Sequence, residues 1–268
     1  MSDSPEKFDT DKPGTTHFGY REVPVGDKQK LVGEVFTSVA RSYDRMNDLM
    51  SLGIHRVWKR YFVGSSGVKR GDAVLDLAGG TGDVAALLHE RVRGDDNSAP
   101  DARGNGSVVL GDINAGMLRV GRDRLTDRGL VAGIDYVQCN AEALPFADRS
   151  FDLVTIAFGL RNVTDKPAAL REMHRVLKIG GRALVLEFSQ VRADWFKPIY
   201  DFHSFQVLPR LGKLIANDAG SYQYLAESIR KHPPQDELQA MMEAAGFARC
   251  GFRNLSGGIV AIHSGYSV

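Results

Sequence analysis

Apolar and polar positions alternate along this chain with two periods, and the period changes from one segment to the next. From residue 28 to residue 63 apolar side chains recur at steps of three and four, which predicts amphipathic helices over 28–50 and 54–63. Short continuous apolar runs begin at residue 73 and predict buried strands instead. The expected strands span 73–77, 107–111, 134–139, 151–158 and 182–188.

Helical patterns fill the gaps between these strands, over 84–92, 115–125 and 167–177. Strands that alternate with helices at this spacing are typical of a mostly parallel sheet covered on both faces. The chain ends differently, with a helical pattern over 235–245 and two short apolar runs, near 247–254 and 258–264, that predict a closing hairpin. We therefore expect an α/β fold built on a doubly wound, mostly parallel sheet.

Three segments depart from this rhythm. Residues 1 to about 27 predict a flexible arm, which leaves one domain over 28–268. The polar stretch 94–106 is rich in Gly, Asp and Asn and predicts a loop insertion at a tolerant edge. Residues 192–230 are rich in aromatic side chains, and a crossover of that length usually carries a lid or a substrate site.

The composition excludes several classes of protein. Lys and Arg total 34 against 33 Asp and Glu, so nothing suggests a polyanion partner, and we expect no nucleic acid. Cys139 and Cys250 stand in no metal-ligand spacing, which fits a reducing compartment and argues against a metal site. No apolar run approaches a membrane span and the first residues do not form a secretory signal, so we expect a cytoplasmic protein, with peripheral membrane contact left open.

The stretch LDLAGGTGD, residues 75–83, places Gly79, Gly80 and Gly82 directly after a predicted strand. From Gly80 onward the chain satisfies the dinucleotide pattern G-x-G-x-x-[GA], but this match is weak alone, because the first turn of any doubly wound sheet favours glycines. Pyrophosphate, another nucleoside and close helix packing all remain open here. The next strand ends at Asp112, where a carboxylate is expected to bind the ribose hydroxyls of whichever nucleoside is present.

Two acids beside the loop favour a cationic ligand. Asp76 and Asp83 would repel a pyrophosphate at the helix N-terminus, where anions otherwise bind well. They suit S-adenosylmethionine, which carries a sulfonium and an ammonium group, although Asp83 is equally explained as a helix-start residue. After a later strand, Asn140 and Ala141 stand where an adenine would be read. This order of elements indicates a class I, Rossmann-like methyltransferase that uses S-adenosylmethionine and no metal.

Further motifs stand both inside and outside this common core. In chain order they read HFGY, VFTSVARSYDRMNDLMSLGIHRVWKR, VLDLAGGTGD, NAEALPF, FGLRNVTDK, LVLEFS, NDAGSYQYLAESIR and GGIVAIHSGY. Together they resemble the UbiE/MenG family of ubiquinone and menaquinone biosynthesis C-methyltransferases, from about His17 to Val268. The resemblance implies methylation of a ring carbon on a prenylated quinol, converting demethylmenaquinol to menaquinol or 2-polyprenyl-6-methoxy-1,4-benzoquinol to its 3-methyl product. Whether one ring system or both are accepted stays open.

The resemblance also assigns cofactor contacts. It carries them onto Thr81, Asp112, Asn140 and Ala141, and the glycines of the loop are expected to lack side chains because the methionine end of the donor lies against their backbone. The family motif TISFGL reads TIAFGL here, so Ala157 keeps only a backbone contact.

For catalysis we expect Arg161 and Asn162, which follow the strand over 151–158 at the cleft edge. The guanidinium would stabilise the developing phenolate and Asn162 would orient the ring oxygen or a water; the alternative is that Arg161 pairs with an acid at the loop surface. Tyr200, His203 and Phe205 in the crossover are expected to bind substrate, although a lone histidine in an aromatic segment is more often structural.

Three other functions stay in competition at this point. They are a nicotinamide oxidoreductase on the same fold, a methyltransferase-like module that binds partners without catalysis, and a methyltransferase for sterols or other phenols. A polyprenyl tail stays in the bilayer, so we expect peripheral attachment to the inner face of the cytoplasmic membrane through the crossover and the N-terminal helices. Contacts with other quinone-biosynthesis enzymes or a second copy of the chain are further open partners.

Overall fold

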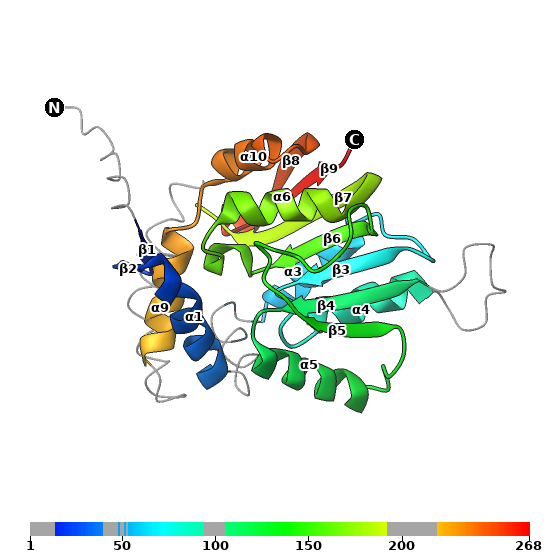
Figure 1. Cartoon of the computed structure of the whole chain (residues 1–268), viewed down its shortest axis with the longest axis horizontal. Coiled ribbons are helices and arrows are strands. Elements are labelled where there is room, and N and C mark those ends of the chain that lie inside the picture. Colours follow the sequence, from blue (N-terminus) through cyan, green and yellow to red (C-terminus); the bar gives the residue numbers. More distant parts are fainter. Residues whose placement is uncertain (1–13, 40–47, 49–50, 52, 94–105, 192–218) are drawn as a thin grey trace.

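The computed structural model describes residues 14–39, 48, 51, 53–93, 106–191 and 219–268. Its centre is a seven-stranded sheet in the order β5-β4-β3-β6-β7-β9-β8, in which β9 runs antiparallel to both neighbours and the other neighbouring pairs are parallel (Figure 1). The strands are β3 (Ala73–Leu77), β4 (Ser107–Asp112), β5 (Ile134–Gln138), β6 (Phe151–Ala157), β7 (Leu177–Phe188), β8 (Ala248–Leu255) and β9 (Val260–Tyr266). The predicted doubly wound sheet and its closing hairpin are confirmed.

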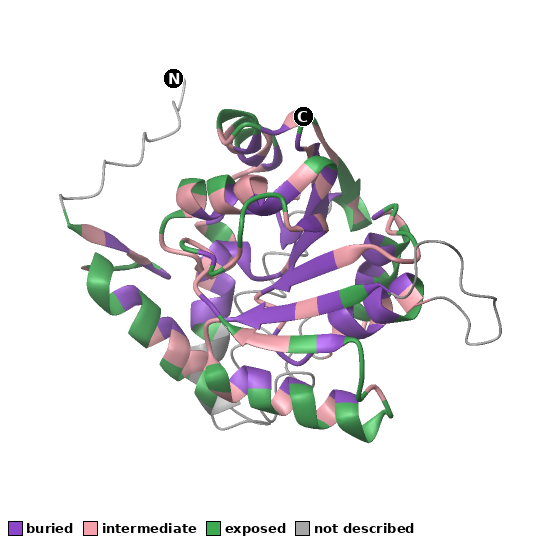
Figure 2. Ribbon diagram, turned by 45° about the vertical axis from the view of Figure 1, so that its right-hand side comes forward, coloured by how far each residue is buried: buried purple, intermediate pink, exposed green. Residues whose placement is uncertain are grey.

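Helices cover both faces of this sheet because its central strands are apolar on both faces. On β3, for example, Val74 packs into one core cluster and Leu75 into the other. The first cluster holds side chains of α3 (His55–Gly64), α4 (Asp83–Arg93) and α5 (Ala115–Asp127), and the second those of α6 (Lys166–Val176) and α10 (Gln235–Ala244). Figure 2 shows the buried strands between these two helical layers.

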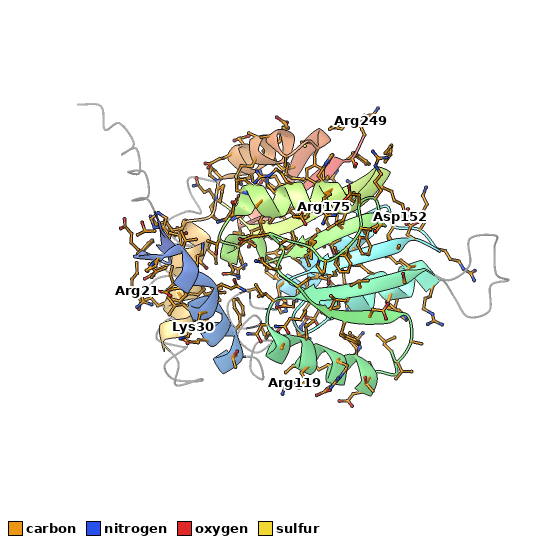
Figure 3. The ribbon with its side chains drawn as sticks, in the orientation of Figure 1. Arg21, Lys30, Arg119, Asp152, Arg175 and Arg249 are labelled. Carbon is orange, nitrogen blue, oxygen red and sulfur yellow. The ribbon has the colours of Figure 1, made fainter. Side chains whose placement is uncertain are left out.

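Local signals fix where the helices begin. Asn114 caps α5, since its side chain accepts hydrogen bonds from the backbone N–H groups of Gly116 and Met117. Asp165 caps α6 in the same way, and Pro167 stands in the first turn, as the sequence predicts. Exposed cations such as Lys30 and Arg119 lie on the outer faces of the helices (Figure 3).

The N-terminal segment differs from its prediction. The expected arm up to residue 27 is wrong from Thr15 on, where β1 (Thr15–Phe18) and β2 (Arg21–Pro24) form a hairpin that runs into α1 (Val25–Val39). The hairpin is held by distant contacts, because the buried ring of Phe18 stacks on Tyr224 at 4.3 Å between centroids. Tyr224 belongs to α9 (Ala219–Arg230), which forms the end of the predicted crossover.

Some predictions fall outside the described residues, namely most of the insertion over 94–106 and the part of the crossover that precedes α9. Within the described segments, no helix combines the length and the apolar character needed to span a bilayer. The same segments contain no group of His, Cys, Asp and Glu side chains arranged to hold a metal ion.

Candidate active site

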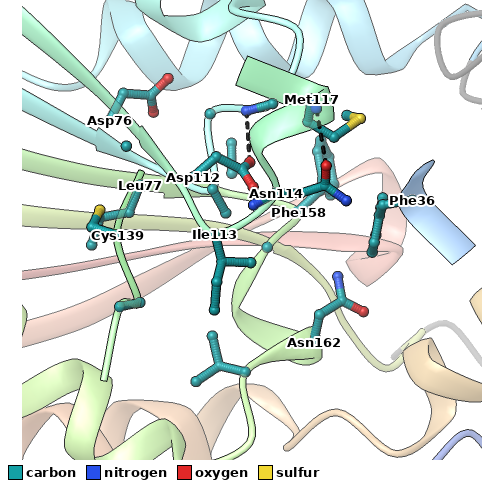
Figure 4. Close-up of a pocket in the computed structure, with 18 of the residues that line it drawn as sticks. Phe36, Asp76, Leu77, Asp112, Ile113, Asn114, Met117, Cys139, Phe158 and Asn162 are labelled. Carbon is teal, nitrogen blue, oxygen red and sulfur yellow. Dashed lines mark hydrogen bonds between the residues drawn. The ribbon is translucent and has the colours of Figure 1, made fainter. Parts of the chain in front are cut away.

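A pocket opens at the carboxyl ends of β3, β4 and β6 (Figure 4). Helix α1 lies beside this edge of the sheet (Figure 1) and contributes to the lining of the pocket. Parallel strands present their terminal residues at one edge of a sheet, which explains why side chains distant in the sequence meet here. The predicted cofactor contacts that line the pocket are Asp76, Gly79, Gly80, Thr81, Asp112, Asn140, Ala141 and Ala157. Gly82 is the predicted contact that does not line it.

The glycine loop is shaped mainly by packing. A Cβ on Gly82 would lie 2.7 Å from Leu125 Cδ1, and one on Gly79 would lie 2.9 Å from Leu110 Cγ. Gly80 has a φ of +52° and would bring a Cβ within 3.1 Å of Met117 Cε. Packing therefore already excludes a side chain at Gly79 and Gly82, where it would collide with β4 and α5, and the contact of these glycines with the methyl donor stays a prediction.

Asp112, the last residue of β4, joins this loop to the next strand. Its Oδ2 accepts a hydrogen bond from the Gly80 backbone N–H over 3.0 Å, and its Oδ1 accepts one from the Asn114 N–H over 2.8 Å (Figure 4). Burial raises the pKa of Asp112 to about 6, although these backbone N–H groups favour the charged form. The carboxylate faces the pocket at the strand end that the sequence assigns to a ribose.

Asp76 is fully buried beneath the loop and also lines the pocket. Its Oδ1 accepts a 2.7 Å hydrogen bond from the Thr155 hydroxyl, whereas Oδ2 has no hydrogen-bond partner in the described part of the chain. Burial raises the pKa of Asp76 to about 7, with Thr155 opposing the shift. A buried carboxylate with one unsatisfied oxygen is suited to accept a hydrogen bond from a cationic ligand.

For Asp83 the sequence leaves two roles open, a partner for a cationic ligand and a helix-start residue. It is the first residue of α4, and its carboxylate forms ion pairs with Lys59 Nζ at 2.8 Å and Arg124 Nη2 at 3.3 Å. Burial alone would raise the pKa of Asp83, but the two cations hold it below its ordinary value. The charge of Asp83 is already matched by these cations, which favours the helix-start interpretation.

The turn after β5 contributes Asn140, Ala141 and Glu142 to the opposite wall of the pocket. The Asn140 Oδ1 accepts a hydrogen bond from the Glu142 N–H over 3.0 Å, which leaves the amide group of this side chain for a ligand. Glu142 in turn accepts hydrogen bonds from the backbone of Thr164 and Asp165. This ties the predicted adenine-reading turn to the segment that follows β6.

Arg161 and Asn162 lie in one short 3-10 turn but face different surroundings. Asn162 lines the pocket, whereas the Arg161 side chain is 2% exposed and forms an ion pair with Glu187 over 2.8 Å. The Arg161 guanidinium also donates to the Phe158 carbonyl and lies over the Phe188 ring. The prediction of a catalytic Arg161 is therefore corrected, because its charge is matched by a buried carboxylate behind the pocket wall.

Several pocket residues were not predicted. Val32 and Phe36 reach the pocket from α1, and Phe158 and Val163 flank Asn162. Lys59 reaches the pocket from α3. The helical period predicts only that this side chain points inward, and it does not indicate a ligand site. The predicted substrate residues Tyr200, His203 and Phe205 lie outside the described residues and stay predictions.

Comparison with known proteins identifies the family. A model of the ubiE/COQ5 methyltransferase family matches residues 24–267. A protein of Stenotrophomonas maltophilia (strain K279a) named "Ubiquinone/menaquinone biosynthesis C-methyltransferase UbiE" is 74% identical over 268 residues, which is 100% of both chains. A protein of Xylella fastidiosa (strain M23) with the same name is 72% identical over 266 residues, 99% of each chain.

Solved structures agree on the fold. A methyltransferase of Aquifex aeolicus described as dependent on S-adenosylmethionine matches with a TM-score of 0.56 and 18% identity, over 87% of this chain and 98% of that one. One of Methanococcus maripaludis matches with a TM-score of 0.56 and 17% identity, over 84% and 91%. The predicted class I methyltransferase fold is confirmed. With its family model matching nearly the whole chain, this protein belongs to the ubiE/COQ5 methyltransferase family.

Proposed function

We propose that this chain transfers the methyl group of S-adenosylmethionine to a ring carbon of a prenylated quinol in ubiquinone or menaquinone biosynthesis. The observation that carries the proposal is the full-length, 74% identity to a protein named for this activity. The pocket supports it independently, because carboxylates lie beside the glycine loop, while apolar side chains of α1 and of the segment after β6 line the same pocket as Asn162.

The residues present fit such a methyl donor. The unsatisfied oxygen of Asp76 would accept a hydrogen bond from its ammonium group, and Asp112 would accept bonds from the ribose hydroxyls. The Asn140 amide and the backbone of Ala141 are placed to recognise the adenine. Thr81 and the backbone of Ala157 line the space between, and S-adenosylmethionine supplies an activated methyl group there.

The acceptor must be activated, because an aromatic carbon is a weak nucleophile. Loss of a phenolic proton from the quinol moves negative charge onto the ortho and para ring carbons. One of these carbons attacks the methyl group in line, so that a carbon–carbon bond forms as the carbon–sulfur bond breaks. The ring carbon then releases its own proton, which leaves the aromatic methylquinol as a phenolate. The phenolate oxygen takes up a proton, so that methylquinol and S-adenosylhomocysteine are the products and one proton is released in net.

Within this scheme the protein positions and polarises the ring. Phe36, Phe158 and Val163 offer an apolar surface for a flat ring, and Asn162 beside them offers a hydrogen bond to a ring oxygen. A hydrogen-bond donor that points at the developing phenolate lowers the barrier most when its position is fixed before the reaction begins. Tyr200, His203 and Phe205 complete the proposed acceptor site from the crossover.

A prenylated substrate also sets where the enzyme works. We place it at the inner face of the cytoplasmic membrane as a peripheral protein, because the polyprenyl tail remains in the bilayer while the ring enters the pocket. Any contacts with other quinone-biosynthesis enzymes, or with a second copy of the chain, would form at the same membrane face.

Deleting the gene and profiling the quinones tests the function in the cell. We expect the methylated quinone to disappear and its demethyl precursor to accumulate. Loss of ubiquinone alone would assign a benzoquinol substrate, and loss of both quinones would assign two ring systems. Unchanged quinones would overturn the proposal. Binding of NAD but not S-adenosylmethionine to the purified protein would instead favour an oxidoreductase.

A further inference from the structure

Helix α3 exposes an apolar stripe that the core does not use. Val57 and Tyr61 on α3 are 61% and 41% exposed, and Ile54, just before the helix, is 44% exposed. Steps of three and four residues place these three side chains on one face. On the opposite face Trp58 and Phe62 are buried in the core, so the helix is anchored and holds the stripe outward.

Cations border this stripe on both sides. Arg56 and Arg60 are exposed on the adjoining surface of α3. On the other side Arg253 of β8 lies over the Tyr61 ring, 5.9 Å from its centroid, and donates a hydrogen bond to the Tyr61 hydroxyl. Neither Arg60 nor Arg253 has a carboxylate within ion-pair distance in the part of the chain that the structure describes.

Beyond Arg60 the surface becomes a basic cleft between α3, α4 and α5. Arg56, Lys59, Arg60, Arg124 and Arg128 line it, and among the described residues Asp48, Asp83 and Glu90 form ion pairs with four of these five cations. Counted over the described residues that line the cleft, five side chains are cationic and Asp83 is acidic, although the whole chain is nearly neutral. The cleft shares Lys59 and Asp83 with the active-site pocket, so the two adjoin.

We infer that this face, made of the Ile54–Val57–Tyr61 stripe and the arginines beside it, docks the enzyme on an anionic phospholipid bilayer. An apolar stripe bordered by arginines is the composition of a helix that lies in a membrane interface. The apolar side chains enter the acyl boundary, Tyr61 sits at headgroup depth, and the arginines meet lipid phosphates. The inference rests on the proposed function, since a polyprenyl tail in the bilayer gives the enzyme a reason to bind there.

Co-sedimentation of the full chain with vesicles tests this surface. We expect binding to vesicles of phosphatidylglycerol and phosphatidylethanolamine that is at least about tenfold tighter than binding to phosphatidylcholine, and that weakens at high salt. Val57→Asp and Arg56→Gln/Arg60→Gln should each lose about tenfold or more in binding. The matched controls are Val131→Asp, at a 74% exposed loop position, and Arg119→Gln/Arg171→Gln on exposed helix positions. These should bind vesicles like the unaltered protein.

Equal binding to neutral and anionic vesicles would overturn the inference, as would α3 variants that bind like the controls. So would a Val57→Asp variant that dissociates an oligomer in sedimentation velocity yet keeps its vesicle binding, since the stripe would then be an interface between copies of the chain.

A soluble quinol with a short tail separates this inference from the proposed function. Without vesicles, Val57→Asp should methylate that quinol as fast as the unaltered protein, and it should be slow only with a long-tailed quinol in anionic vesicles. If the unaltered protein methylates the soluble quinol but ignores vesicles, the docking surface is wrong and the function stands. If it binds vesicles but never transfers a methyl group, the function is wrong.

Discussion

The hydroxyl of Tyr224 donates a hydrogen bond to Oδ1 of Asn162 over 3.0 Å, and this bond sets the direction of the Asn162 amide. With Oδ1 engaged, the amide hydrogens are the groups left to face the pocket. Tyr224 is itself held firmly, since it is 5% exposed and stacked on Phe18. The N-terminal hairpin and α9 thus position a donor in the active site, which suits stabilisation of a phenolate oxygen.

Replacing Tyr224 with Phe tests this relationship, because it removes the hydroxyl and keeps the ring that stacks on Phe18. We expect kcat to fall about fivefold, consistent with roughly 1 kcal/mol for one hydrogen bond, with unchanged affinity for S-adenosylmethionine. In an Asn162→Ala background the same replacement should have no further effect on kcat. An equal loss in both backgrounds would mean that Tyr224 acts on the pocket by another route.

The ion pair between Arg161 and Glu187 predicts a stability effect. Arg161→Met leaves a buried carboxylate uncompensated and should lower the free energy of unfolding by about 3 kcal/mol or more, measured by urea denaturation. Arg161→Met/Glu187→Leu should recover much of that loss, because both charges are gone. If Arg161→Lys keeps full stability but abolishes methyl transfer, the guanidinium has a direct chemical role that its buried position does not explain.

Asp76 should lower the stability of the ligand-free protein and strengthen the binding of S-adenosylmethionine. Asp76→Asn keeps an oxygen for the Thr155 hydroxyl and removes a buried charge, so it should raise the melting temperature of the ligand-free protein at pH 8, by roughly 2–4 °C for each kcal/mol gained. The same replacement should weaken S-adenosylmethionine binding by about tenfold or more in calorimetry. A variant that binds the donor normally would remove Asp76 from the donor site.

The pH dependence follows from the raised pKa values of Asp76, about 7, and Asp112, about 6. Both lie above the unfolded value, so between pH 4 and pH 7 the folded state holds more protons. These two groups therefore make the free energy of unfolding fall as pH rises through that window. Asp76→Asn should accordingly gain stability over the unaltered protein as pH increases from 5.5 to 8.

The affinity for S-adenosylmethionine should depend on pH in the opposite direction to the stability contributed by these two carboxyl groups. A cationic ligand favours the charged carboxylates, so affinity for S-adenosylmethionine should weaken as pH falls from 8 to 5.5, and binding near pH 6.5 should release protons. Calorimetry in buffers of different ionisation enthalpy measures that release directly. Binding without proton release at this pH would contradict the assignment of both carboxylates to the donor site.

Features that depend on neighbours in sequence were predictable. The apolar runs that become β3 and β4 give the strand ends, and strand ends place Asp112 and the glycine loop at one edge of the sheet. Asn140 is placed at the same edge of the sheet because it follows the end of β5. The hairpin at Thr15–Phe18 and Arg21–Pro24 was missed because its strands are four residues long and only partly apolar, and its burial depends on Tyr224, about two hundred residues later.

Charges were harder to assign, because pairing depends on folding. Asp83 and Asp76 look alike in the sequence, yet Lys59 and Arg124 neutralise the first while the second is buried with one unsatisfied oxygen. Arg161 and Asn162 are adjacent, but one side chain faces Glu187 and the other faces the pocket. A local motif indicates which residues gather at a site; the packing around them decides which stay chemically active.

The most direct measurement of the central claim is methyl transfer to carbon. The purified chain is incubated with S-adenosylmethionine labelled with ¹³C in its methyl group and a short-tailed demethyl naphthoquinol or benzoquinol, and the product is examined by mass spectrometry and NMR. We predict one labelled methyl group bonded to a ring carbon, with S-adenosylhomocysteine in equal amount. Label on a ring oxygen, or no transfer to either quinol despite bound donor, would contradict the account.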